Sequence, residues 1–162
     1  MSKQIKISTM KTKNEVTAEA VQVLREATGA GVMDCRKALL ETNGDFEAAK
    51  KVIQEKGLSK VEKRAGRATG AGLVHSYVHN GRIGVLLEIR AETDFVVRSE
   101  PFQALTHEVA MQIAAASPAD VPALLAQPYI KDESRTVKDL VNDVIAKVGE
   151  NISISQFSRM EV

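Results

Sequence analysis

The pair Asn80-Gly81, placed between two alternating apolar segments, is the feature that most constrains how this chain can fold. Leu73–His79 precedes the pair, and Ile83–Arg90 follows it with apolar residues at every second position. Such alternation is typical of half-buried strands. A type I′ turn needs positive φ at both central residues, and Asn-Gly adopts that conformation at low cost. The sequence therefore predicts a β-hairpin.

The residues after the hairpin predict an amphipathic helix. Ser99 and Pro101 are suited to its start, and Ser117-Pro118 is suited to its end. The apolar residues recur at helical spacing on one face, at Phe102, Leu105, Val109 and Ile113. A helix with such a face packs on a sheet or on another helix.

A second amphipathic helix and a last strand complete this part of the chain. A loop containing two prolines leads to Thr136, which is predicted to cap the second helix, and Gly149 closes that helix. Residues 152–162 alternate again, but the apolar face shifts between Ile154 and Phe157, which indicates a bulge or a bend. Strands separated by helices, with a hairpin first, predict an α+β core: a small antiparallel or mixed three-stranded sheet covered by helices on one face.

Residues 17–57 show a different pattern, with apolar residues at helical spacing in three short bursts. Thr17 is suited to cap the first helix, Gly29 and Gly31 separate the first two, and Asn43-Gly44-Asp45 precedes the third. Helices this short are marginal alone in water, so we expect them to pack together as a three-helix headpiece. The three apolar faces consist of Ala20, Val21 and Leu24; Val32, Cys35 and Leu39; and Phe46, Ala49 and Ile53.

Polar segments flank the headpiece. Residues 1–16 are Lys-rich without an apolar core, which favours a flexible tail over a signal peptide. Residues 58–70 contain four basic side chains and end in a cluster of glycines, which indicates a polar linker with helical potential. The predicted organisation is a tail, a headpiece over 17–57, a linker, and the α+β core over 71–162.

The composition disfavours several classes of function. Lys and Arg number 22 against 21 Asp and Glu, and the net charge of +1 gives no field that attracts nucleic acid. No run of about 18 apolar residues exists to span a membrane. The single cysteine, Cys35, excludes an intramolecular disulfide and suits a reducing compartment. We predict a cytoplasmic protein, with an organellar matrix or stroma as the alternative.

No set of residues in the sequence is arranged for covalent chemistry. Gly29-Ala30-Gly31 lacks the rest of a dinucleotide motif or a P-loop. His75 and His79 share a strand face but have no third ligand in the hairpin, so solvated or cross-strand histidines are the better interpretation. Cys35 has no neighbour that would activate it. We predict that the chain is not an enzyme and uses neither a cofactor nor a metal.

The tetrapeptide Thr93-Asp94-Phe95-Val96 joins the hairpin to the next helix and places a carboxylate beside an aromatic ring. Connections between rigid elements often carry function because those elements aim them. Two interpretations are open. Asp94 and Phe95 form an exposed probe for a partner, or Phe95 packs in the local core and Asp94 only caps the coming helix.

Four segments of the sequence resemble the translation elongation factor Ts family. Leu24–Leu39 is similar to the family's N-terminal signature and Glu92–Val96 to its core signature. Gln127–Asp132 and Gly149–Ile152 look like its C-terminal blocks. The match is shortened between residues 117 and 124 compared with long members. A second core subdomain and a coiled-coil hairpin are therefore expected to be absent.

This resemblance implies an exchange factor for elongation factor Tu, a GTPase that holds GDP and magnesium. It implies that Thr93–Val96 act near the partner's magnesium, with Phe95 as a wedge and Asp94 disturbing the surroundings of the metal. In the headpiece, the positions that the family uses to contact the GTPase correspond to Arg25, Val32, Met33 and Arg36. Taken alone, Val32 is equally well explained as a core residue and the two arginines as solvated side chains.

Two further predictions concern partners. The core holds one copy of the Thr93–Val96 signature and few strands, so we predict that a second subunit completes its sheet in a homodimer. The rival function is a protein–protein adaptor, because the headpiece also resembles ubiquitin-associated (UBA) domains. Acceleration of GDP release from elongation factor Tu discriminates the two functions.

Overall fold

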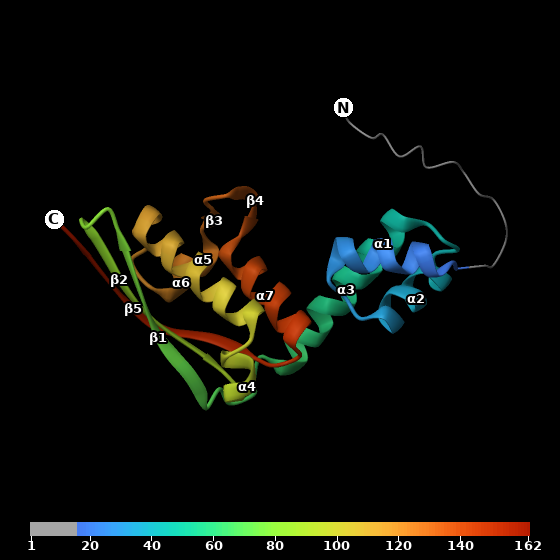
Figure 1. Cartoon of the computed structure of the whole chain (residues 1–162), viewed down its shortest axis with the longest axis horizontal. Coiled ribbons are helices and arrows are strands. Elements are labelled where there is room, and N and C mark those ends of the chain that lie inside the picture. The colour runs from blue at the N-terminus through green and yellow to red at the C-terminus, as the bar shows by residue number, and fades with distance from the viewer. Residues whose placement is uncertain (1–15) are drawn as a thin grey trace. The chain divides into compact units, whose positions relative to one another are not determined.

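The computed structural model describes residues 16–162, which divide into two units (Figure 1). The first unit ends at Glu55, and the second comprises Lys56–Val162. Residues 1–15 of the predicted tail lie outside the described residues. Val16, the last residue of that predicted segment, packs against the core of the first unit.

The first unit contains α1 (Ala18–Thr28), α2 (Val32–Glu41) and the N-terminal part of α3 (Phe46–Arg64). The predicted boundaries of α1 are present. The Thr17 side chain accepts a hydrogen bond from the backbone N–H of Ala20, and Gly29 ends the helix with a φ of 68°. The side chains buried between the helices are Val21, Leu24, Cys35, Ala38, Leu39 and Ala49. All regular elements of this unit are helices, as the sequence predicts.

The third helix is longer than the sequence pattern indicates. Residues 58–64, which are predicted as linker, are the last turns of α3. Lys, Glu and Arg are good helix formers, and Val61 packs against the core of the second unit, so the helix continues. The prediction of a short third helix is therefore wrong. The domain boundaries and the independent movement of the two units stay predictions.

The second unit is built on an antiparallel sheet with the order β1-β2-β5 (Figure 1). Its strands are β1 (Ala71–His79), β2 (Ile83–Ala91) and β5 (Ile152–Glu161). Asn80 and Gly81 both have positive φ, at 50° and 68°, and the Arg82 N–H donates to the His79 carbonyl at 3.0 Å. The predicted hairpin is thus confirmed, with Arg82 as a third residue in its loop.

The predicted irregularity in the last strand is also confirmed. Glu88 pairs with Gln156, whereas the next residue of β2, Ile89, pairs with Ile154. Ser155 is therefore the extra residue of a β-bulge. The bulge lets β5 keep apolar side chains on the inner face of the sheet on both sides of the irregularity.

Helices cover one face of the sheet (Figure 1). α5 (Glu100–Ala116) packs on β1 and β2, and α7 (Val137–Val148) packs on α5. The predicted caps of α7 are present, since Thr136 and Asp139 form a capping box and Gly149 ends the helix with a φ of 80°. The largest buried side chains of this core are Leu87, Ile89, Phe102, Val109, Ile113, Leu124 and Val137.

The segment between α5 and α7 is more ordered than the predicted loop. It forms α6 (Val121–Ala126) and a small hairpin of β3 (Pro128–Tyr129) and β4 (Asp132–Thr136). Pro122 lies in the first turn of α6, where a proline needs no N–H partner. The buried Gln112 of α5 donates to the Pro128 carbonyl at 3.1 Å and accepts from the Ile130 N–H at 2.9 Å. This tertiary contact supports a hairpin that the local sequence does not indicate.

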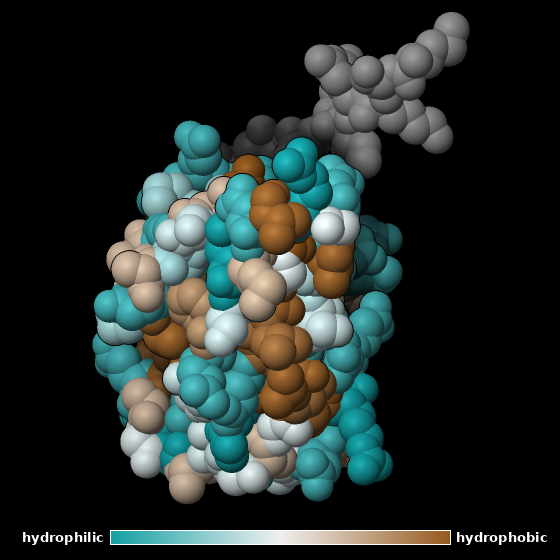
Figure 2. All heavy atoms as spheres, turned by 90° about the vertical axis from the view of Figure 1, so that its left-hand side faces the viewer, coloured by the Kyte–Doolittle hydropathy of each residue, from teal (hydrophilic) through white to brown (hydrophobic). Residues whose placement is uncertain are grey.

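The opposite face of the sheet is bare and partly apolar within the second unit. Figure 2 shows apolar side chains gathered in a band on the side of the molecule where the sheet lies. The exposed large apolar residues of the three strands are Val74, Val78, Leu86 and Met160. Gly84 lies between its register partners Val78 and Met160. None of the helices in residues 16–162 is long and apolar enough to cross a membrane.

Candidate functional site

The tetrapeptide at the end of β2 forms a single helical turn rather than a loop. α4 (Asp94–Val97) begins directly after Thr93, whose hydroxyl accepts a hydrogen bond from the Val96 N–H at 3.4 Å. Thr93 is therefore the N-cap, and Asp94 is the first residue of the helix. We call residues 93–97 the Thr93 turn.

Phe95 has the largest exposed fraction, 84%, among the large apolar side chains of the described residues. Thr93 and Asp94 beside it are also exposed. The next two residues, Val96 and Val97, are buried in the core of the second unit, and Val96 is only 4% exposed. The alternative in which Phe95 packs in the local core is therefore wrong. The two valines anchor the turn while the aromatic ring points into solvent.

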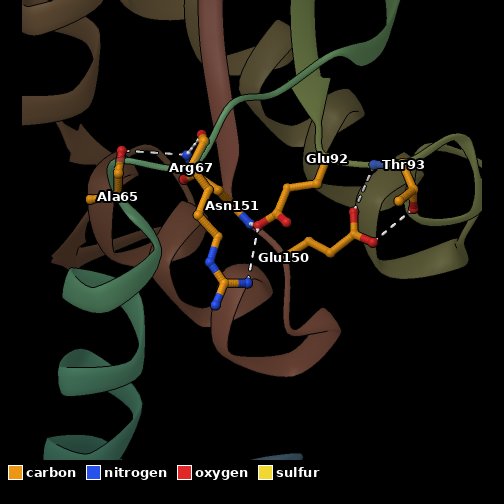
Figure 3. Close-up of polar contacts among 6 residues, drawn as sticks. All are labelled: Ala65, Arg67, Glu92, Thr93, Glu150 and Asn151. Carbon is orange, nitrogen blue, oxygen red and sulfur yellow. Dashed lines mark hydrogen bonds and ion pairs between the residues drawn. The ribbon is translucent and has the colours of Figure 1, made fainter.

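A tertiary contact holds the Thr93 turn from the other end of the chain (Figure 3). The Glu150 carboxylate accepts hydrogen bonds from the Thr93 backbone N–H at 3.0 Å and from the Thr93 hydroxyl at 2.7 Å. In the adjacent pair, the Asn151 backbone N–H donates to the Glu92 carboxylate at 2.7 Å. Residues 92–93 and 150–151 thus exchange hydrogen bonds in both directions.

Asn151 extends this network to the chain that leaves α3 (Figure 3). Its side chain is buried, and its amide donates to the Arg67 carbonyl at 2.8 Å and to the Ala65 carbonyl at 3.4 Å. Arg67 also forms an ion pair with Glu92 at 3.7 Å. The predicted site did not include Glu92, Glu150 or Asn151. Glu150 and Asn151 could have been found from the sequence, because both lie in Gly149–Ile152, a segment that resembles a C-terminal block of the family.

The predicted contact residues of the headpiece are exposed. Met33 is 59% and Val32 is 48% exposed, and both arginines, Arg25 and Arg36, are also exposed. Val32, Met33 and Arg36 lie on one side of α2 because the helix turns 100° per residue. Of the three apolar residues predicted to face the core from α2, Cys35 and Leu39 are buried and Val32 is not. The interpretation of Val32 as a core residue is therefore wrong. We call Arg25, Val32, Met33 and Arg36 the headpiece surface.

All three histidines of the chain meet on the helix-covered side of the second unit. The His75 ring lies 5.9 Å from that of His107 on α5, and the Tyr77 ring lies 5.5 Å from His107 and 6.1 Å from His79. Burial lowers the pKa of His75, and the neighbouring His107 lowers it further. No group of His, Cys, Asp or Glu in residues 16–162 is arranged to hold a metal ion. The sequence did not indicate that His107 joins the two strand histidines.

Comparison with known proteins finds a family model and close relatives. A family model described as Elongation factor TS matches residues 92–162. Elongation factor Ts of Solidesulfovibrio magneticus is 44% identical, over 90% of this chain and 96% of the relative. The chain belongs to the elongation factor Ts family. Elongation factor Ts of Coprothermobacter proteolyticus is 41% identical and that of Caldanaerobacter subterraneus 43%, each over 90% of this chain and 97% or 96% of the relative.

The family model matches the Thr93 turn and the C-terminal residues that bond to it. The matched residues begin at Glu92 and continue through Glu150 and Asn151. The alignment with the Solidesulfovibrio elongation factor Ts extends over 191 positions, more than the 162 residues of this chain. This member of the family therefore lacks residues that the relative has.

Proposed function

We propose that this chain is a guanine-nucleotide exchange factor that binds elongation factor Tu in its GDP-bound form and promotes GDP release during translation elongation. Membership of the elongation factor Ts family supports the partner. The observation that carries the proposal is the exposed Phe95 beside Asp94 on a turn anchored by buried valines. A large aromatic ring in solvent has an unfavourable contact with water that a partner's apolar slot would remove.

The energetics of exchange define what the Thr93 turn must do. A ligand held with nanomolar affinity is bound by about 12 kcal/mol, so rapid release requires a partner whose binding opposes nucleotide binding. The coupling is reciprocal, since GDP weakens the exchange factor as much as the factor weakens GDP. Burying the Phe95 ring contributes roughly 1.5–3 kcal/mol toward a displaced arrangement of the GTPase. Asp94 adds a carboxylate that disturbs the surroundings of the partner's magnesium.

The headpiece surface supplies a second contact in this proposal. Met33 and Val32 offer adaptable apolar area, and Arg25 and Arg36 offer planar donor groups. We propose that the three helices form a UBA-like domain that docks on the GTPase. Headpiece docking contributes affinity, and the Thr93 turn contributes the displacement of the nucleotide.

The bare face of the sheet supports the proposal of a homodimer. Four exposed apolar side chains lie together on one face of the strands, and Gly84 leaves room between two of them for a partner's side chain. A second copy of this chain, presenting the same face, would remove that surface from water. A Leu86→Lys variant is expected to be monomeric in sedimentation analysis. Leu58→Lys, a similarly exposed leucine on α3, is the control.

The main test follows the release of a fluorescent GDP analogue from elongation factor Tu. The unmodified chain is expected to accelerate release, and Phe95→Ala is expected to lower the maximal rate by roughly 10- to 100-fold. Asp94→Ala is expected to act in the same direction. Val162→Ala removes a similarly exposed apolar side chain and is expected to have no effect. Binding without any acceleration by the unmodified chain would select the adaptor function instead.

A further inference from the structure

The Thr93 turn lies where the backbone pairing of the sheet stops. The β2–β5 ladder ends at the pair Ala91–Ile152. Beyond this pair the backbone groups need other partners, and the carboxylates of Glu92 and Glu150 accept from the backbone N–H groups of Asn151 and Thr93. Side chains therefore extend the attachment between β2 and β5 past the end of the strands.

This attachment matters because α4 is too short to be stable by itself. A helix of four residues has too few internal hydrogen bonds to offset the cost of nucleation. The buried Val96 and Val97 anchor the C-terminal side of the turn, and their backbone N–H groups donate to the Thr93 hydroxyl at 3.4 Å and to the Thr93 carbonyl at 3.2 Å. Neither contact engages the Thr93 N–H or ties the residue to another part of the chain. The two hydrogen bonds from Thr93 to Glu150 fix that residue, which sets the direction in which Phe95 leaves the backbone.

We infer that Glu150 is a positioning residue for nucleotide exchange, which holds Thr93 so that Asp94 and Phe95 adopt their binding arrangement before the partner arrives. The inference rests on the proposed function, because it assigns Glu150 a role in that activity. Glu150 does not need to touch the partner. It orders the turn before binding, so that less conformational entropy is lost when the turn binds the partner.

This role predicts a specific kinetic pattern. Without the carboxylate, only a fraction of the molecules present the turn correctly, and the apparent affinity for the partner is the intrinsic affinity multiplied by that fraction. Glu150→Ala is therefore expected to raise the half-saturating concentration for GDP release about tenfold, which is the size expected for lost hydrogen bonds to a charged group. The maximal rate at saturation is retained, because Phe95 and Asp94 are still present. Loss of Phe95 itself lowers the maximal rate instead.

The experiment measures GDP release from elongation factor Tu over a range of chain concentrations. In parallel, amide hydrogen exchange of Thr93 and Val96 is measured in the isolated chain, where the partner plays no part. Glu150→Ala is expected to speed exchange of both amides. Glu133→Ala removes an exposed carboxylate from β4 and is the matched control, with no change in either measurement.

Substitutions at the other end of the contact keep the test decisive if Glu150→Ala fails to fold. Thr93→Val removes the hydroxyl at nearly the same volume and is expected to reproduce the rise in half-saturating concentration, whereas Thr93→Ser restores the contact. Because the hydroxyl also accepts from the Val96 N–H, amide exchange in Thr93→Val is read at residue 93. Unchanged amide exchange in Glu150→Ala and Thr93→Val would overturn the inference, as would faster exchange with unchanged GDP release. An unmodified chain that does not accelerate release refutes the proposed function, and the amide exchange still reports separately whether Glu150 orders the turn.

Discussion

The headpiece surface and the Thr93 turn are both exposed, but they are built in different ways. Met33 and Arg36 are displayed by one helix, because Cys35 and Leu39 on its other side face the core. The Thr93 turn depends on Glu150, which is 57 positions away in the sequence. The exposure of Met33 and Arg36 follows from the local periodicity of α2. A surface held by a distant carboxylate depends on the completed sheet.

The largest effect is expected from a substitution in the core beneath the headpiece surface, which leaves the core beneath the Thr93 turn intact. Leu24 is fully buried in the headpiece core, and Leu24→Ala is expected to destabilise the headpiece by about 2–5 kcal/mol through the cavity it leaves. Amide exchange should rise throughout α1 and α2 and stay unchanged at Val96. Val23→Ala, at the exposed neighbouring position, is the control. Loss of protection at Val96 would show that the two surfaces are not independent.

A smaller effect is expected at the residue that precedes Glu150. Gly149 ends α7 with a φ of 80°, a conformation that costs other residues about 1–2 kcal/mol. Gly149→Ala is expected to lower the free energy of unfolding of the second unit by that amount in urea titrations. It should also speed exchange of the Thr93 amide, since Glu150 follows directly. Gly66→Ala, where neither positive φ nor a close neighbour opposes a Cβ, is the control.

The two units should also differ in their response to pH, since all three histidines lie in the second unit. The pKa of His75 is lowered in the folded chain, first by burial and then by His107, so the unfolded chain binds more protons below the ordinary value of 6.5. The stability of the second unit is complete above that value and falls as the pH drops through it, by at most about 1.4 kcal/mol per pH unit for one proton.

Urea unfolding at about pH 7.5 and about pH 5.5 measures this dependence, in a range where model carboxyl groups stay ionised. His75→Val is expected to reduce the slope for the second unit. The headpiece, whose described residues include no histidine, should unfold at the same urea concentration at both pH values. An equal pH response of the two units would contradict the assignment to His75.

The smallest effect on stability is expected on the headpiece surface itself. Met33→Ala should change the free energy of unfolding by less than about 0.5 kcal/mol, because the side chain is mostly in solvent. It should raise the half-saturating concentration for GDP release without lowering the maximal rate. Leu40→Ala, on the same helix but outside the headpiece surface, is the control. A lowered maximal rate for Met33→Ala would mean that the headpiece takes part in displacing the nucleotide.

Most errors of prediction fall where a residue's surroundings come from distant parts of the chain. Val32 follows the apolar spacing of α2 but stands at its first turn, beyond the packed part of the headpiece. The hairpin of β3 and β4 follows two prolines that suggest a loop, and it receives support from Gln112 on α5. The third helix is predicted too short because the packing of Val61 against the core of the second unit leaves no trace in the local pattern.

The sequence by itself determined the elements whose chemistry is local. Asn80-Gly81 specifies its turn because few other pairs accept two positive φ values, and Thr136 and Gly149 specify the ends of α7 through hydrogen bonds within one turn of the helix. Only the tertiary structure decided that Phe95 points outward, that Glu150 reaches Thr93, and that His107 joins His75. Burial and long-range hydrogen bonds depend on which surfaces meet when the sheet and its helices pack, and no window of neighbouring residues contains that information.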